Sequence, residues 1–142
     1  MASILLRVPI EATPTAVFDA VATSEGVNGW WSNHTRGPSG PNSTMEVTFP
    51  DAPMAFQFEV TEQSPGDRVA WHCLAGPPEW IGTDVSFEVQ RGDNGGSSLL
   101  FTHSGWATTE ESFPFIAYSW AQILPRLKKL AESGQAQPFF DF

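Results

Sequence analysis

The stretch from Phe113 to Ser133 carries the strongest pattern in the chain. Large apolar residues recur along it at intervals of four, three, four and three, namely Ile116, Trp120, Ile123, Leu127 and Leu130. This spacing predicts a single apolar face on an α-helix. Gly134 follows at once and predicts the C-terminal cap. A helix with such a face needs an apolar surface to lie on, which the rest of the chain must supply.

Two signals compete for the start of this helix. Thr108 and Glu111 have the spacing of a capping box, whereas Ser112 as the N-cap would place Pro114 in the first turn. Proline is tolerated in the first turn but not deeper in a helix. We therefore predict the later start, with Ser112 as the N-cap.

The preceding chain alternates apolar and polar residues with a period of two, which predicts β-strands. One strand is expected at residues 4–10 and five more at residues 44–49, 54–61, 69–74, 81–89 and 99–103. In the last five strands, the predicted inward side chains begin with Met45, Met54, Val69, Ile81 and Leu99, respectively. Two short helices are expected after the first strand, one capped by Thr13 and one starting at Thr23 or Ser24. We predict an α+β domain over residues 1–142, with a one-sided antiparallel sheet facing the C-terminal helix.

Charge and composition exclude several classes of function. The chain has 16 acidic and 7 basic residues, giving a net charge of −9. Without a basic patch, we expect neither nucleic-acid binding nor binding to an anionic membrane. A single cysteine excludes an internal disulfide, and the three histidines show no metal-ligand spacing, so we expect no metal and no cofactor. Without a signal peptide or a membrane-length apolar run, we expect a cytoplasmic protein with no membrane insertion.

Two motifs resemble a known superfamily. The run Ile10-Glu11-Ala12-Thr13-Pro14-Thr15-Ala16-Val17-Phe18-Asp19-Ala20, followed by Gly29-Trp30-Trp31, resembles the opening of START-like (SRPBCC) proteins. The run from Trp120 to Gly134 is similar to the closing helix of the Hsp90-ATPase-activator-homologue-1-like (AHSA1-like) branch. The resemblance implies a helix-grip fold, in which a curved antiparallel sheet wraps around the C-terminal helix. It also implies a cavity between sheet and helix that binds small apolar molecules.

We therefore expect the protein to bind a small apolar or aromatic ligand, including lipids, in this cavity. The candidate cavity residues lie on the cap, the inner sheet face and the helix; they are Trp30, Trp31, Phe56, Phe58, Trp71, Cys73, Thr83, Val85, Phe87, Phe101, His103, Phe115, Ile116, Trp120 and Ile123. Among them, Thr83 and His103 are the polar groups that would orient a ligand. The alternative is that both are core residues whose hydrogen bonds are satisfied within the protein. For Trp30 and Trp31, gating of the cavity competes with simple packing of the cap.

His103 is predicted to be buried at the end of its strand. Burial would hold its imidazole in the neutral form, with one donor and one acceptor that suit a ligand hydroxyl or carbonyl. A nucleophilic pair of Cys73 with His103 is conceivable, but apolar surroundings would raise the pKa of the thiol and make it inert. We therefore expect no catalytic residues, and a binding module rather than an enzyme.

Two other functions follow from the resemblance. A cyclase-like or hydrolase-like enzyme would use the same cavity. A co-factor of an Hsp90-type chaperone is the other alternative, although 142 residues leave no room for the additional N-terminal domain of the eukaryotic activators. The tail from Gln137 to Phe142 holds three phenylalanines, so it is expected either to fold back on the sheet or to bury against a second copy in a homodimer.

Overall fold

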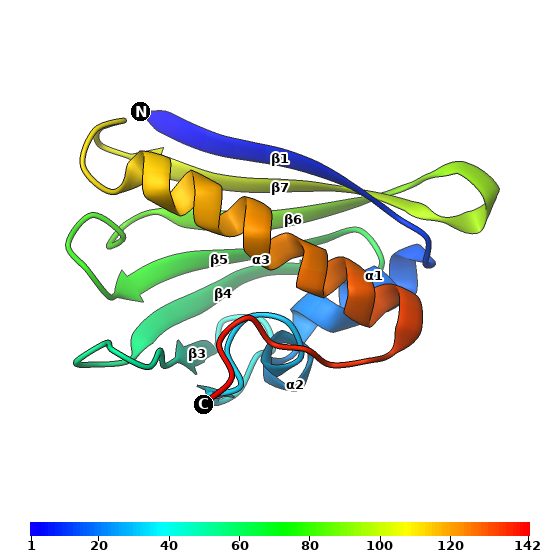
Figure 1. Ribbon diagram of the computed structural model, residues 1–142, viewed down its shortest axis with the longest axis horizontal. Helices are drawn as coiled ribbons and strands as arrows, with labels where there is room; N and C mark the ends of the chain where they lie inside the picture. The colour runs from blue at the N-terminus through cyan, green and yellow to red at the C-terminus, as the bar shows by residue number, and fades with distance from the viewer.

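The computed structural model describes residues 1–142 and consists of a seven-stranded antiparallel sheet with a long helix across one face (Figure 1). The strands are β1 (Ala2–Ile10), β2 (Thr35–Arg36), β3 (Thr44–Val47), β4 (Phe56–Ser64), β5 (Arg68–Ala75), β6 (Asp84–Arg91) and β7 (Ser97–Trp106). Their order in the sheet is β1-β7-β6-β5-β4-β3-β2. The helices are α1 (Pro14–Ala22), α2 (Ser24–Asn28), the short 3-10 helix η1 (Asp93–Gly95) and α3 (Phe113–Ser133). No helix combines the length and the apolar character needed to cross a bilayer.

The helix boundaries follow local capping chemistry. The Thr13 hydroxyl accepts a hydrogen bond from the Ala16 amide and begins α1, and Thr23 does the same for α2 through the Gly26 amide. Helix α3 ends at Gly134, whose φ of 75° is the left-handed conformation that glycine adopts without a steric penalty. The predicted caps at Thr13 and Gly134 are confirmed, and α2 begins at Ser24, one of its two predicted starts. Val27, Trp30 and Trp31 have the i, i+3, i+4 spacing that predicts a helix through the tryptophan pair, but α2 ends earlier, at Asn28.

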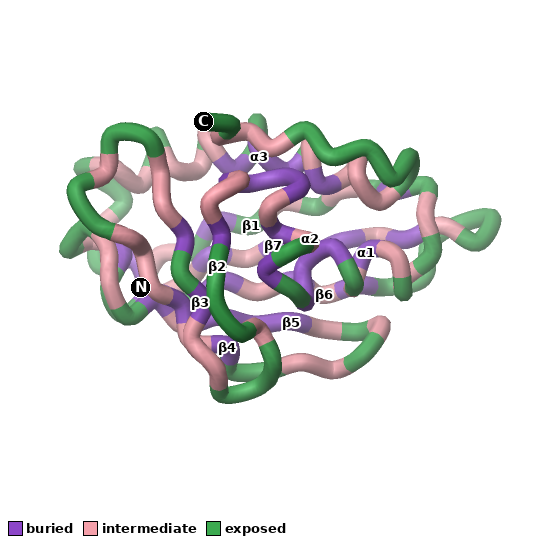
Figure 2. The backbone as a smooth tube through the Cα atoms, turned by 90° about the horizontal axis from the view of Figure 1, so that it is seen from below, coloured by how far each residue is buried: buried purple, intermediate pink, exposed green.

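The inner face of the sheet forms one continuous apolar core with α1 and α3. Buried residues follow the strands, whereas the outer loops are exposed (Figure 2). The prediction that Met54 and Ile81 point inward is wrong, because their side chains are 62% and 53% exposed, respectively. Both belong to turns, because β4 begins only at Phe56 and β6 only at Asp84. The short strand β2 lies outside the six predicted strands.

Helix α3 lies close to the sheet at its C-terminal half. There the Lys128 ammonium donates a hydrogen bond to the Pro9 carbonyl at 2.7 Å, and the Glu132 carboxylate accepts one from the Glu11 amide at 2.7 Å. The N-terminal half faces the loops after β3 and β5, at the end of the sheet opposite α1 (Figure 1). These two hydrogen bonds tie the C-terminal half of α3 to the end of β1 and the start of the following loop.

The C-terminal tail folds back on its own chain, but it pairs with the segment around Trp30 and Trp31 rather than with the sheet, as one of the two predictions had it. Backbone hydrogen bonds join Phe139 to the Trp30 carbonyl and Phe140 to the Trp31 carbonyl. Phe140 packs against Phe49 with ring centroids 5.0 Å apart, whereas Phe142 stacks on the exposed side of the molecule against His34. The tail is therefore part of the folded structure next to the Trp30-Trp31 pair.

Phe140→Ala is expected to lower the free energy of unfolding by about 2 kcal/mol, because a half-buried aromatic ring is removed from an aromatic cluster. Phe142→Ala removes the same side chain two residues later, where it is 47% exposed, and should cost about 0.5 kcal/mol or less. Urea unfolding of both variants measures the difference. Equal losses would show that the tail does not pack as described.

Candidate functional site

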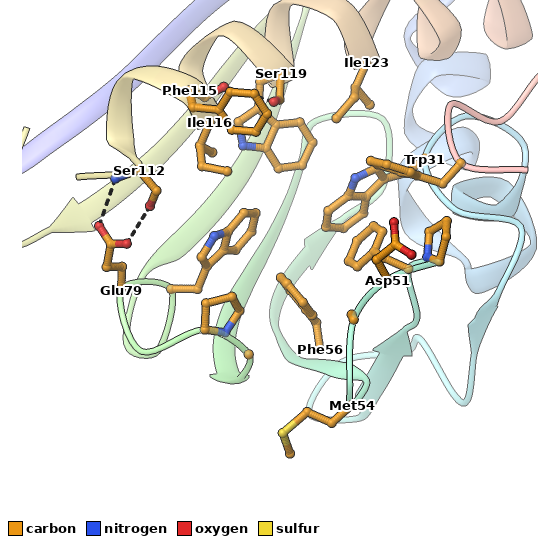
Figure 3. Close-up of a pocket in the computed structure, with 18 of the residues that line it drawn as sticks. Trp31, Asp51, Met54, Phe56, Glu79, Ser112, Phe115, Ile116, Ser119 and Ile123 are labelled. Atoms are coloured by element: carbon orange, nitrogen blue, oxygen red, sulfur yellow. Dashed lines mark hydrogen bonds between the residues drawn. The ribbon is translucent and has the colours of Figure 1, made fainter. Parts of the chain in front are cut away.

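A groove of about 750 Å³ opens between the N-terminal half of α3 and the loops that follow β3 and β5 (Figure 3). Its volume lies within the range of small-molecule sites. Helix α3 contributes Phe115, Ile116, Ser119, Trp120 and Ile123 to one wall. These residues project toward the groove because positions three and four apart share one face of a helix. The opposite wall comes from the two loops and from Phe56 at the start of β4.

Five aromatic side chains form a continuous circle in this groove, which we call the aromatic cup: Trp31, Phe49, Phe56, Trp80 and Trp120. Neighbouring ring centroids around the circle are 5.2, 4.8, 5.2, 6.4 and 5.0 Å apart. These separations are typical of aromatic pairs in contact. The three indole rings are buried, so the surface that the cup presents to the groove comes mainly from the half-buried rings of Phe49 and Phe56.

The groove has stiff rims. Pro50 and Pro53 flank the turn after β3, and Pro77 and Pro78 lie in the loop after β5. Proline restricts the backbone, which reduces the entropy lost when a ligand orders a loop. Gly76 has a φ of 153°, and a Cβ atom there would lie 3.3 Å from the Phe56 ring. Glycine at this position therefore allows the chain to pass directly against the aromatic cup.

Glu79 is held on the groove rim by the start of α3. The Ser112 hydroxyl donates to one carboxylate oxygen at 2.7 Å, and the Ser112 amide donates to the other at 3.2 Å (Figure 3). Ser112 precedes α3 as predicted, but its side chain accepts no hydrogen bond from the helix. Its hydroxyl donates to Glu79 instead. The negative charge that stabilises the helix N-terminus therefore comes from a carboxylate 33 residues earlier in the sequence.

Asp51 is the other charged residue that lines the groove, and the lining contains no lysine, arginine or histidine. Asp51 lies in the turn after β3 and is drawn near Trp31, away from Glu79 (Figure 3). Its exposed carboxylate has no hydrogen-bond or ion-pair partner within the protein. The charged groups of the groove are thus two carboxylates, and its polar side chains also include the hydroxyls of Ser112 and Ser119 and the indole N–H groups of Trp31 and Trp80.

The structure divides the residues predicted from sequence into two groups. Six line the groove: Trp31, Phe56, Phe115, Ile116, Trp120 and Ile123. Nine are buried in the core beneath or beside it and do not line it: Trp30, Phe58, Trp71, Cys73, Thr83, Val85, Phe87, Phe101 and His103. The difference arises because alternation along a strand identifies an inward face, whereas the side chains of the aromatic cup cover most of that face.

His103 is fully buried, as predicted, but both of its ring nitrogens are engaged within the protein. The Trp120 indole N–H lies 3.1 Å from Nδ1, and the Thr83 hydroxyl lies 2.9 Å from Nε2. Because an indole nitrogen only donates, Nδ1 must accept and Nε2 must carry the proton. The Thr83 hydroxyl then donates to the Trp80 carbonyl at 2.6 Å. This chain links β7, α3 and the β5–β6 loop behind the cup and leaves no ring nitrogen for a ligand.

Burial lowers the pKa of His103 to about 3, so its ring is neutral at physiological pH. Burial also raises the pKa of the Cys73 thiol to about 11, and its Sγ lies 3.5 Å from the Ala75 carbonyl oxygen. Cys73 is therefore a protonated thiol without a base beside it. No three His, Cys, Asp or Glu side chains come close enough to hold a metal ion.

Several groove residues were missed from the sequence, most of them in loops. Trp80 follows Gly76-Pro77-Pro78, where no periodicity assigns it to a face, yet it is buried and belongs to the aromatic cup. Asp51 and Glu79 lie in loops, where charged residues are common, so no pattern identified them as groove residues. The one available signal was the content of six tryptophans in 142 residues, which indicates a core rich in large aromatic side chains without assigning Trp80 to the groove.

Comparison with known proteins connects this geometry to a family. No family model and no curated protein matches the chain. Among solved structures, DynU16 of the dynemicin biosynthetic locus has a TM-score of 0.79 at 21% identity over 99% of this chain and 51% of its own. CalU16 from Micromonospora echinospora has a TM-score of 0.72 at 14% identity over 93% of this chain and 77% of its own. At these identities, the two comparisons show only that this chain shares the helix-grip fold with DynU16 and CalU16.

The Aha1 dimer from Colwellia psychrerythraea, solved in solution, is more similar in sequence. It has a TM-score of 0.82 at 32% identity, over 94% of this chain and 98% of its own. Its fold matches the seven-stranded sheet and the long C-terminal helix described above. With this identity across nearly the full length of both chains, the chain belongs to the Aha1-like branch of the START-like (SRPBCC) superfamily.

Proposed function

We propose that the protein binds a small apolar or aromatic molecule in the groove between α3 and the loops after β3 and β5. The observation that carries this proposal is the aromatic cup, a circle of five contacting rings at the base of a groove of about 750 Å³. The half-buried rings of Phe49 and Phe56 and the exposed ring of Phe115 leave apolar surface open to water in the groove, and a ligand that covers it gains the corresponding free energy. The stiff proline rims support binding without large rearrangement.

The proposal predicts binding of a neutral aromatic probe such as 1-naphthalenemethanol. Ser119→Trp places a large ring in the groove without removing a core side chain, and it should weaken binding roughly tenfold or more. Gln122→Trp adds the same ring three residues later on α3, where the position is exposed and outside the groove, and should leave the affinity unchanged. Isothermal titration calorimetry measures both affinities. Equal affinities of the two variants, or no binding to the unmodified protein, would refute the proposal.

Two further roles are candidates because the chain is 32% identical to an Aha1 that is described as a dimer. The first is self-association, which sedimentation equilibrium of the full chain would detect. The tail is already used in the fold of its own chain, so a dimer would not need it. The second is a co-factor role toward an Hsp90-type chaperone, and an unchanged chaperone ATPase rate with excess protein would exclude it.

A further inference from the structure

We propose that the groove selects hydrophobic cations, such as aromatic or alkyl ammonium compounds, over anions of the same size and shape. This inference rests on the proposed function and names the class of ligand. Two features of the groove carry it, namely the aromatic cup and the sign of every charged group in the lining.

The aromatic cup provides favourable surroundings for a cation. Each aromatic ring carries a negative electrostatic potential on its face, which attracts an ammonium group placed within about 6 Å. Circles of several aromatic side chains are a general means of binding quaternary ammonium groups. The rings that a ligand reaches are those of Phe49, Phe56 and the neighbouring Phe115, because the three indole rings of the cup are at most 7% exposed and form its base. A ligand without charge would still bind through apolar contact alone.

The charges of the lining act in the same direction. Asp51 and Glu79 are both negative, and no basic residue lines the groove to bind a carboxylate, sulfate or phosphate. Glu79 is fixed by two hydrogen bonds from Ser112, whereas Asp51 has no partner and is available to a ligand. An anionic ligand would enter a groove flanked by like charges on a protein with a net charge of −9. Fatty acids and other carboxylates are thus disfavoured at this site.

Three matched probes test the inference at pH 7.5: neutral 1-naphthalenemethanol, cationic (1-naphthylmethyl)trimethylammonium and anionic 1-naphthaleneacetate. The cation should bind about tenfold or more tightly than the anion, since cation–aromatic attraction and carboxylate attraction each contribute several-fold. Calorimetric titration gives the three affinities. If the neutral probe binds but the anion binds as tightly as the cation, the inference is wrong while the proposed function stands. If none of the three binds, both are wrong.

The contribution of Asp51 is separated from that of the whole-molecule charge by a matched pair. Asp51→Asn should lower the cation-to-anion affinity ratio about threefold and leave neutral binding unchanged. Asp19→Asn makes the same change in net charge on the exposed surface of α1, outside the groove, and should leave the ratio within about 1.5-fold of its original value. Equal effects of the two variants would assign the preference to net charge and overturn the inference.

Discussion

Replacing Trp120 with alanine is expected to lower the free energy of unfolding by about 3–5 kcal/mol, the largest effect among single substitutions in the groove. Trp120 is buried at the centre of the molecule, with ring centroids 4.6 Å from Phe101 and 5.0 Å from Trp31. The substitution leaves a cavity in this cluster. It also removes the indole N–H that donates to His103, so a buried acceptor loses its partner.

Two matched variants separate these contributions and can contradict the account. Trp120→Phe keeps most of the ring but lacks the indole N–H, and should cost about 1–2 kcal/mol. Tyr118→Ala removes an aromatic ring from the same helix where it is 61% exposed, and should cost about 0.5 kcal/mol or less. Urea unfolding monitored by circular dichroism gives all three values. If Trp120→Ala cost no more than Tyr118→Ala, Trp120 would not be the central contact of α3.

The second large effect is acid destabilisation through His103. Burial lowers the pKa of this histidine from 6.5 to about 3 in the folded protein. Below pH 6.5 the unfolded chain therefore takes up a proton that the folded protein does not, and the free energy of unfolding falls by about 1.4 kcal/mol per pH unit until about pH 3. Protonation at Nδ1 would also direct an N–H toward the Trp120 indole N–H, so two donors would face each other.

Between pH 7.5 and pH 5.0, this linkage should remove about 2 kcal/mol of the unfolding free energy. His103→Gln offers an amide oxygen to Trp120 and an amide N–H to Thr83 but does not titrate. The variant is expected to be less stable at pH 7.5 because its shape differs, but to lose about 2 kcal/mol less than the unmodified protein on acidification. Parallel losses in the two proteins, measured by urea unfolding at both pH values, would show that His103 is not the responsible group.

The elements of the fold were predictable because their signals are periodic and local. Helix α3 was predicted from one apolar stripe, and its bounds, Phe113–Ser133, agree with the proline and glycine signals at its ends. The strands were predicted from alternation. Met54 and Ile81 were wrongly predicted to point inward, because the alternating pattern in the sequence extends into turns. In the first of these turns, the hydrogen bond from the Ala52 amide to the Phe49 carbonyl replaces strand pairing.

The groove was predictable only in part, because loops far apart in sequence complete it. Trp120 and Ile123 lie on a periodic helix face, and both were placed toward the sheet. Trp80, Asp51 and Glu79 reach the groove only through the path of their loops, which no local pattern encodes. The burial of His103 followed from alternation. The hydrogen bond from Trp120 to His103 depends on how α3 is placed against β7. A pattern within one helix or one strand does not predict that placement.

The most direct test of the central claim uses the six tryptophans as internal reporters. Trp31, Trp80 and Trp120 line the groove, whereas Trp30, Trp71 and Trp106 are buried outside it. In NMR spectra of the full chain with 1-naphthalenemethanol, intermolecular NOEs should connect the naphthalene protons to indole protons of the first three residues and to none of the second three. A bound probe whose NOEs fall on the second set, or on no tryptophan, would contradict the assignment of the groove as the binding site.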